Sequence, residues 1–282
     1  MVRRKPYLTA PGKPSKAQDV IVCTTRQLPV KLRPAAAETA TAINPANRPH
    51  PAAVSRALLI HRGTRRERIA VVVGKRWPAS GVRLTVGFLD NPASDLRARI
   101  LLHMNAWAKT ANVVFTESST DQDVRISRVN SPPDMAGYWS YVGTDIKHTK
   151  PGDATMNLES FTMATPESEY LRVVRHETGH TLGFPHEHMR RQLVAKIDQK
   201  KAFKYFADTE GWDKQAVIDQ VLTPLEESTI LGTTKADQLS IMCYQLPGSI
   251  TKDGKPIIGG TDIDDQDYQF AASIYPKQVT GK

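Results

Sequence analysis

Cysteine is scarce in this sequence: only Cys23 and Cys243 occur among its 282 residues. Two cysteines exclude the dense disulfide framework on which many small secreted domains depend. The fold must therefore rest on an apolar core, and the 40% of apolar residues is enough to fill one. A single bridge between the two cysteines is compatible with the sequence, although no pattern supports it.

Long apolar runs are also absent. No stretch of about 18 apolar residues occurs, so we expect no helix that spans a membrane. The first residues are basic, as in a signal peptide, but only Val20 to Cys23 is apolar where such a signal needs about 7 to 15 apolar residues. We therefore predict no secretion signal, which leaves a cytoplasmic protein or export by a leaderless route.

Acidic residues are rare in the first quarter of the chain. Residues 1–76 contain 16 lysines and arginines but only 3 acidic residues, whereas residues 77–282 contain 22 basic and 26 acidic residues. Such a basic arm could bind a nucleic acid or an anionic surface. A solvated extension or a pro-segment is the simpler interpretation, because the basic residues are not interleaved with stacking aromatic side chains.

The hydrophobic pattern divides the chain into three parts. Residues 1–76 form the basic extension or pro-segment, in which Pro34 to Ile43 predicts a short helix and Ile69 to Val73 a strand. Residues 77–276 form the main domain, and residues 277–282 form a tail.

The main domain begins with a mixed order of strands and helices. Alternating residues predict strands at 82–88, 112–117, 123–128 and 153–160. A helix is expected after residue 94, with Met104 and Trp107 on its buried face.

Helical patterns dominate the second half of the domain. Residues 198–206 and 213–222 predict amphipathic helices. Asp262, Asp264 and Asp265 superficially resemble a calcium-binding cluster. Because aspartate favours helix N-termini, they are better explained as the start of a closing helix.

The most specific signal is the stretch HETGHTLGFPH, in which His176, Glu177, His180, Gly183 and His186 follow the spacing HExxHxxGxxH. Residues four apart lie on one face of a helix, so His176 and His180 can direct both imidazoles at one metal ion. Glu177 would lie at the flank of the ion, where a carboxylate can take a proton from a bound water without being a ligand.

The third histidine must approach the metal from another direction. Gly183 permits the left-handed turn that ends a helix, and Pro185 prevents its continuation. Three protein ligands and one open position are typical of catalytic rather than structural zinc. We therefore predict one catalytic Zn²⁺ held by His176, His180 and His186.

Three ordered motifs resemble the astacin family of metzincin metallopeptidases. HETGHTLGFPHEHMR, from His176 to Arg190, is similar to the zinc signature of the family, including Glu187 after the third histidine. GYWSYVG at 137–143 resembles the strand and loop ahead of the zinc helix, and SIMCY at 240–244 resembles the Met-turn. The resemblance spans about 77–275 and implies a zinc endopeptidase.

The resemblance implies an α/β (α+β) fold with the two lobes of a metzincin catalytic domain. The upper lobe, residues 77–183, would hold a mixed twisted sheet and the helices above the zinc. The lower lobe, residues 184–276, would be mostly helical.

The resemblance also implies roles for three segments. Met242 would form an apolar floor under the histidines. Tyr244 would be the switchable tyrosine of the family, a possible fifth zinc ligand that swings out to hydrogen-bond the oxyanion. The strand at 153–160 would be the edge strand that pairs with an extended substrate.

The sequence departs from the family pattern at the disulfides and in the pro-segment. Tyr138 stands where the family usually has cysteine, and the FxGD motif that family pro-segments place on the zinc is absent from residues 1–76. In processed members Glu187 pairs with the new N-terminus. Arg65 and Arg66 lie where such a cut would fall, and without a cut Glu187 would instead pair with an arginine side chain.

Two further side chains concern the site. The thiolate of Cys23 would be a soft ligand able to cap the zinc in a latent chain. His188 lies two residues beyond the third ligand, and we expect it to point away from the metal rather than to act beside it.

These observations predict a zinc-dependent endopeptidase that acts on protein or peptide substrates as a monomer. Zinc would lower the pKa of its water to near 7, Glu177 would take the proton, and Tyr244 would stabilise the oxyanion. Two other classes stay open: a catalytically silent zinc-stabilised binding protein, and a nucleic-acid or anionic-surface binder that uses the basic arm. The enzyme is favoured because every catalytic position is filled, whereas the arm offers only charge.

Overall fold

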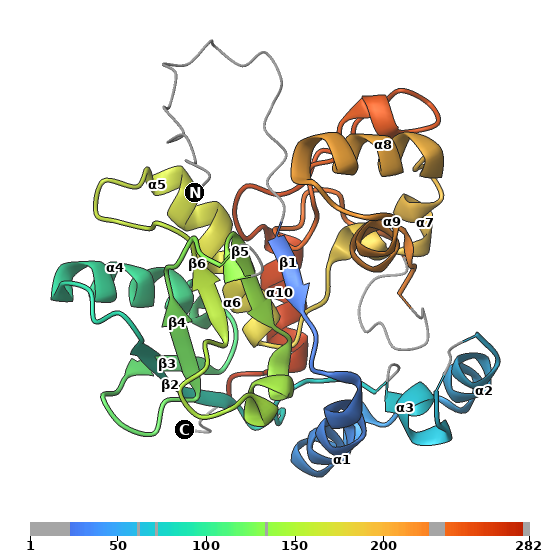
Figure 1. Cartoon of the computed structure of the whole chain (residues 1–282). Helices are drawn as coiled ribbons and strands as arrows, with labels where there is room; N and C mark the ends of the chain where they lie inside the picture. The colour runs from blue at the N-terminus through green and yellow to red at the C-terminus, as the bar shows by residue number, and fades with distance from the viewer. Residues whose placement is uncertain (1–22, 61–62, 71–72, 133–134, 226–234, 279–282) are drawn as a thin grey trace, which may run out of the picture.

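The computed structural model of the chain describes residues 23–60, 63–70, 73–132, 135–225 and 235–278. A six-stranded sheet in the order β1-β5-β6-β4-β2-β3 organises this part of the chain (Figure 1). Neighbouring strands pair in parallel, except that β5 and β6 are antiparallel. The strands are β1 (Cys23–Arg26), β2 (Val82–Phe88), β3 (Val113–Glu117), β4 (Val124–Ser127), β5 (Tyr138–Tyr141) and β6 (Met156–Leu158).

Helices account for most of the regular secondary structure in the second half of the chain. The α-helices are α1 (Arg33–Ile43), α2 (Pro51–Ile60), α3 (Arg65–Ala70), α4 (Ser94–Met104), α5 (Glu167–Glu169), α6 (Arg175–Thr181), α7 (Arg191–Val194), α8 (Gln199–Glu210), α9 (Lys214–Val217) and α10 (Asp265–Ile274). Short 3-10 and π-helical turns are η1 (Val30–Leu32), η2 (Pro45–Asn47), η3 (Asn105–Lys109), η5 (Gly143–His148), η6 (Tyr170–Val174), η7 (Glu187–Met189), η8 (Ile218–Leu222) and η10 (Gly248–Ile250). None of the helices in the described ranges is both long and apolar enough to cross a membrane.

The expected mixture of strands and helices is confirmed. Strands β2, β3 and β4 match the predicted ranges to within one residue at each end, and Met104 and Trp107 are fully buried. Asp264 caps α10 by accepting a hydrogen bond from the backbone of Asp267, so the acidic run does begin a helix.

Two predicted strands are wrong in position or role. Residues 69 and 70 end the helix α3, where Ala70 is buried and α3 packs against α1; residues 71–72 lie outside the described ranges. The run 153–160 contains only the three-residue β6, which lies between β4 and β5 and is buried along its whole length. The strand next to α6 is β5, which would be an edge of the sheet if β1 did not pair with it.

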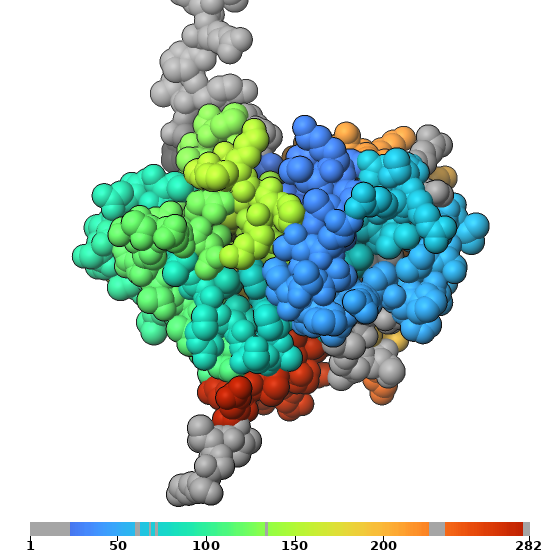
Figure 2. Space-filling view, turned by 90° about the horizontal axis from the view of Figure 1, so that it is seen from below, coloured from blue at the N-terminus to red at the C-terminus, as the bar shows by residue number. Residues whose placement is uncertain are grey.

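The N-terminal segment, residues 23–76 as far as they are described, packs on the rest of the chain. Helix α1 lies against η5, and the Nε2 atom of His148 is 2.8 Å from the hydroxyl of Thr39. Figure 2 shows the N-terminal helices, in blue and cyan, side by side with the green half of the molecule that holds the sheet. The boundaries at residues 76 and 183 stay predictions.

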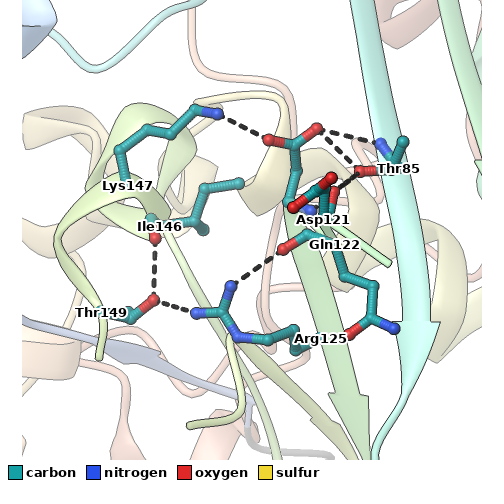
Figure 3. Close-up of polar contacts among 8 residues, drawn as sticks. Thr85, Asp121, Gln122, Arg125, Ile146, Lys147 and Thr149 are labelled. Atoms are coloured by element: carbon teal, nitrogen blue, oxygen red, sulfur yellow. Dashed lines mark hydrogen bonds and ion pairs between the residues drawn. The ribbon is translucent and has the colours of Figure 1, made fainter. Parts of the chain in front are cut away.

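A polar network fixes η5 to the sheet (Figure 3). Lys147 of η5 donates to Asp123 at 2.6 Å, and the other carboxylate oxygen accepts from the backbone of Thr85 at 3.0 Å. Burial alone would raise the pKa of Asp123, but these partners lower it below its ordinary value. Arg125 of β4 donates to Thr149 just after η5. The surface on which α1 packs is thus held rigidly to the strands.

Two large apolar clusters form the core of the described chain. The first joins the sheet to α4, η6 and α10, whereas the second joins α7, α8, α9 and the chain after the Met-turn. Cys23 belongs to the second cluster although it lies on β1. The N-terminal strand therefore touches both halves of the structure.

Asn47 provides a test of how firmly the N-terminal segment is attached. Its buried side chain donates to the carbonyls of Ala40 and Arg76 and accepts from the backbone of Arg76 at 3.0 Å. Asn47→Ala should lower the free energy of unfolding in urea by roughly 2–3 kcal/mol, because buried backbone groups lose their partners. The exposed Asn130, changed to alanine, is the control and should stay within about 0.5 kcal/mol of wild type. Equal stability of both variants would contradict the attachment.

Candidate metal and catalytic site

The zinc-motif helix is part of one helical run, α5–η6–α6, that contains a π-helical turn just before His176. π-turns inside helices are frequent at functional sites. Two tryptophans hold α6 at its ends: Trp107 donates to the carbonyl of Arg175 at 2.9 Å and Trp77 to that of Thr181 at 2.8 Å. The helix is therefore held at both ends by residues from earlier parts of the chain.

The turn after α6 has the geometry that the sequence predicts. Gly183 has a φ of 93°, in the left-handed region that favours glycine. The backbone N–H groups of Gly183 and Phe184 close the turn on the carbonyls of His180 and Gly179, at 2.8 and 3.0 Å. This reversal brings His186 back to the helix face that carries the first two histidines.

The three histidines converge through their Nε2 atoms. The Nε2 of His186 is 3.3 Å from that of His176 and 3.0 Å from that of His180. The Nδ1 atoms of His176 and His180 lie 2.6 and 2.8 Å from the carbonyls of Ile241 and Phe184. A carbonyl only accepts hydrogen bonds, so both Nδ1 atoms carry the proton and both Nε2 atoms present a lone pair.

This arrangement fits a tetrahedral metal. Bonds of 2.0–2.1 Å from zinc to nitrogen place neighbouring ligand nitrogens about 3.3 Å apart, close to the separations found here. Burial holds the pKa of His176 at about 4 and lowers those of His180 and His186 well below the ordinary value. The rings are therefore neutral, the form that binds a metal.

Cys23 completes the cluster as a fourth donor. Its sulfur and the three ring nitrogens all lie within 4.8 Å of one another, and all four side chains are buried. In the absence of a metal, burial and then the nearby Glu177 raise the pKa of the thiol well above its ordinary value. A bound cation reverses this preference, because a coordinating thiol loses its proton. The structure thus brings together the soft ligand and the histidines that the sequence suggested.

Glu177 lies beside this cluster. It is completely buried, and neither carboxylate oxygen makes a hydrogen bond of ordinary geometry within the described part of the chain. Burial raises its pKa to about 8, against smaller lowering by Cys23 and Arg172. A carboxyl group with this pKa can both accept and return a proton near neutral pH.

Tyr244 and His188 form a stacked pair next to the histidines. Their ring centroids are 3.9 Å apart at 16°, and Tyr244 also lies 4.3 Å from the ring of His186. The phenol oxygen of Tyr244 is buried and has no hydrogen-bond partner among the described residues. The expectation that His188 points away from the site is wrong: its Nε2 is 2.9 Å from the carbonyl of Gln220, which turns the ring inward.

The Met-turn lies directly under α6. A Cβ atom added at Gly179 would come within 2.4 Å of the sulfur of Met242, so only glycine allows this approach. Asp267 of α10 holds the turn by accepting from the hydroxyl of Ser240 at 2.6 Å and the backbone of Ile241 at 2.8 Å. Burial raises the pKa of Asp267 to about 7 despite these bonds. The sequence analysis missed this residue, although its place three residues after Asp264 signals a capping box.

Glu187 pairs with an arginine side chain, as expected for an uncut chain. Its Oε1 atom lies 3.6 Å from Arg190 and accepts from the backbone of Asp237 at 3.0 Å. Arg65 and Arg66, the predicted cutting region, lie at the start of helix α3. A protease would have to unwind that helix to cut there.

Comparison with known proteins identifies the family. The model of the peptidase family described as "Astacin" matches residues 71–245. The chain belongs to the astacin family of zinc metallopeptidases. Serralysin B of Dickeya chrysanthemi is 30% identical over 184 residues, which are 61% of this chain and 38% of that protein. The chain thus spans well under half the length of this curated relative.

Solved structures of myroilysin resemble the fold. One is 26% identical with a TM-score of 0.66 and covers 73% of this chain and 97% of its own. A second, also 26% identical, has a TM-score of 0.54 and covers 72% and 86%. The predicted α/β metzincin fold class is confirmed, and the histidine cluster is the candidate metal site that the family leads one to expect.

Removal of one histidine tests the metal site. His180→Ala should reduce zinc affinity by more than the roughly 10–100-fold that loss of a supporting hydrogen bond costs, because a direct ligand is lost. Zinc content after dialysis against a competing chelator measures this. The exposed His50, changed to alanine, should keep full zinc content; equal retention by both variants would rule out the site.

Proposed function

We propose that the chain is a zinc-dependent endopeptidase whose described form is latent. One observation carries the proposal: three neutral imidazoles bring their Nε2 atoms together at one position, next to the buried carboxylate of Glu177, which makes no hydrogen bond of ordinary geometry among the described residues. His176, His180 and His186 would hold the zinc. Bound zinc would supply a Lewis acid and a water of lowered pKa.

The protein's own groups would carry the protons and the charge. Glu177 takes a proton from the attacking water at a carboxylate oxygen and later gives it to the leaving amine. Tyr244 donates its phenol hydrogen to the developing oxyanion, which supplies the missing partner of that hydroxyl. His188 keeps the tyrosine ring in its place by stacking.

Cys23 is the basis for the latency. It occupies the fourth donor position, and β1 pairs along β5, the edge at which an extended peptide would add a strand. The cavity left beside the site measures only about 30 Å³, between Cys23, Glu177 and Tyr244 among other residues. A protein or peptide substrate therefore requires β1 to leave.

Neither rival class has comparable support. A zinc-stabilised binding protein without turnover has no need of a buried carboxylate that lacks a partner beside the metal position, because such a group costs stability. The basic arm is described only from Cys23 onward, and there β1 forms part of the sheet. Residues 1–22, which hold 5 of the 16 lysines and arginines of the arm, lie outside the described ranges.

Replacing the general base should separate zinc binding from turnover. We expect Glu177→Ala to bind zinc as wild type does and to lose about 10²- to 10⁴-fold in the rate of casein cleavage, the usual contribution of a positioned base. A chelator-treated wild-type sample serves as the metal-free reference. Cleavage at the wild-type rate would contradict the assigned role.

Removing the cap should have the opposite effect. Cys23→Ala opens the fourth position, and we expect the uncut chain to cleave casein at least about tenfold faster. A tenfold change corresponds to about 1.4 kcal/mol, the free energy by which the thiolate would compete with substrate for the metal. Cys243→Ala, which removes the other buried thiol, is the matched control. An unchanged rate in Cys23→Ala, with zinc bound, would refute latency through this cysteine.

A further inference from the structure

Strand β1 is held on both of its edges, by β5 on one and by Gln220 on the other. The side-chain amide of Gln220 donates to the main-chain carbonyl of Thr25 at 3.4 Å. Its oxygen accepts from the hydroxyl of Thr25 at 3.3 Å. Thr25 pairs with Ser140 of β5 in the sheet register. The extended chain in the cleft is therefore contacted by the second half of the molecule as well as by the sheet.

The main-chain half of this contact does not depend on which peptide lies in the cleft, whereas the bond from the Thr25 hydroxyl does. A primary amide carries both a donor and an acceptor, so it can pair with the main chain of a strand in either direction. The carbonyl of Thr25 is a group that every residue possesses. Gln220 can therefore make the same main-chain bond to a substrate that replaces β1.

Gln220 also projects from a rigid support. Val217 and Val221, on either side of it in α9 and η8, are completely buried in the second apolar cluster. The carbonyl of Gln220 itself lies 2.9 Å from the Nε2 of His188, which stacks on Tyr244. Because the side chain of Gln220 is held in this way relative to Tyr244, it can fix the position of a bound peptide.

We propose that Gln220 is a main-chain binding residue of the peptide cleft, which holds β1 in the latent chain and an extended peptide substrate after β1 leaves. This inference rests on the proposed endopeptidase function for the identity of the second occupant. It adds a contact that lies opposite β5 and is independent of the metal ligands.

The first measurement follows β1 in the full chain. N-ethylmaleimide reacts with Cys23 only when β1 opens, and peptide mapping by mass spectrometry distinguishes Cys23 from Cys243. In Gln220→Leu we expect Cys23 to be alkylated roughly 3- to 10-fold faster than in wild type, the factor that corresponds to one or two net hydrogen bonds. The control is Gln215→Leu, since the exposed Gln215 bonds only to Asp219 at 2.9 Å among the contacts described.

The second measurement follows a peptide. Full chain carrying Glu177→Ala and alkylated at Cys23 cannot return β1 to the cleft or cut what it binds. The dissociation constant of a fluorescein-labelled casein peptide is then measured by anisotropy in the zinc-loaded protein. We expect Gln220→Leu to raise it roughly 3- to 10-fold and Gln215→Leu to leave it unchanged.

The outcomes separate this proposal from the proposed function. If the peptide binds equally well to the Gln220→Leu and Gln215→Leu chains, the inference is overturned, whatever the alkylation rates show. If zinc-loaded chain that is alkylated at Cys23 and keeps Glu177 binds the peptide but never cuts it, the endopeptidase fails while the role of Gln220 in binding stands. Should Gln220→Leu melt early by circular dichroism, Gln220→Glu replaces it, because it keeps the size and the acceptor but loses the donor to Thr25.

Discussion

Two backbone carbonyls determine the chemistry of this protein. Those of Ile241 and Phe184 bind the Nδ1 hydrogens of His176 and His180, and this fixes both Nε2 lone pairs toward one point. Burial removes the alternative of protonating the rings. Two lone pairs that face each other in a buried space repel one another unless a cation lies between them, so the candidate metal site follows from the position of main-chain oxygens as much as from the histidines.

These oxygens belong to two segments whose positions are fixed by other contacts in the structure. Phe184 follows the glycine turn that ends α6, and Ile241 belongs to the Met-turn, which Asp267 holds from below. The tryptophan contacts at both ends of α6 complete the frame. The N-terminal strand depends on the same arrangement, because Cys23 reaches the metal position only while β1 lies along β5.

The sequence was informative where chemistry is encoded by spacing. The HExxHxxGxxH pattern predicted the convergence of three side chains and the left-handed glycine, both of which depend on local helix geometry. It could not place β6 inside the sheet, because strand order depends on pairings between distant residues and on a strand contributed by residues 23–26. The predicted direction of His188 is wrong for a related reason. Its ring bonds to the carbonyl of Gln220, which lies on a helical turn more than 30 residues further along the chain. The sequence identifies Cys23 only as a possible soft ligand, because the residues around it do not predict a strand that reaches the metal position.

The link between Asp267 and the Met-turn bears on the order in which the chain becomes functional. A ribosome makes Cys23 long before His186, and the bonds from Asp267 to the Met-turn can form only once α10 has been made. The capping strand is thus already present at every stage at which the histidines could first gather a metal. In the proposed latent chain, the strand that would cap the metal position is therefore made before the residues of the candidate active site.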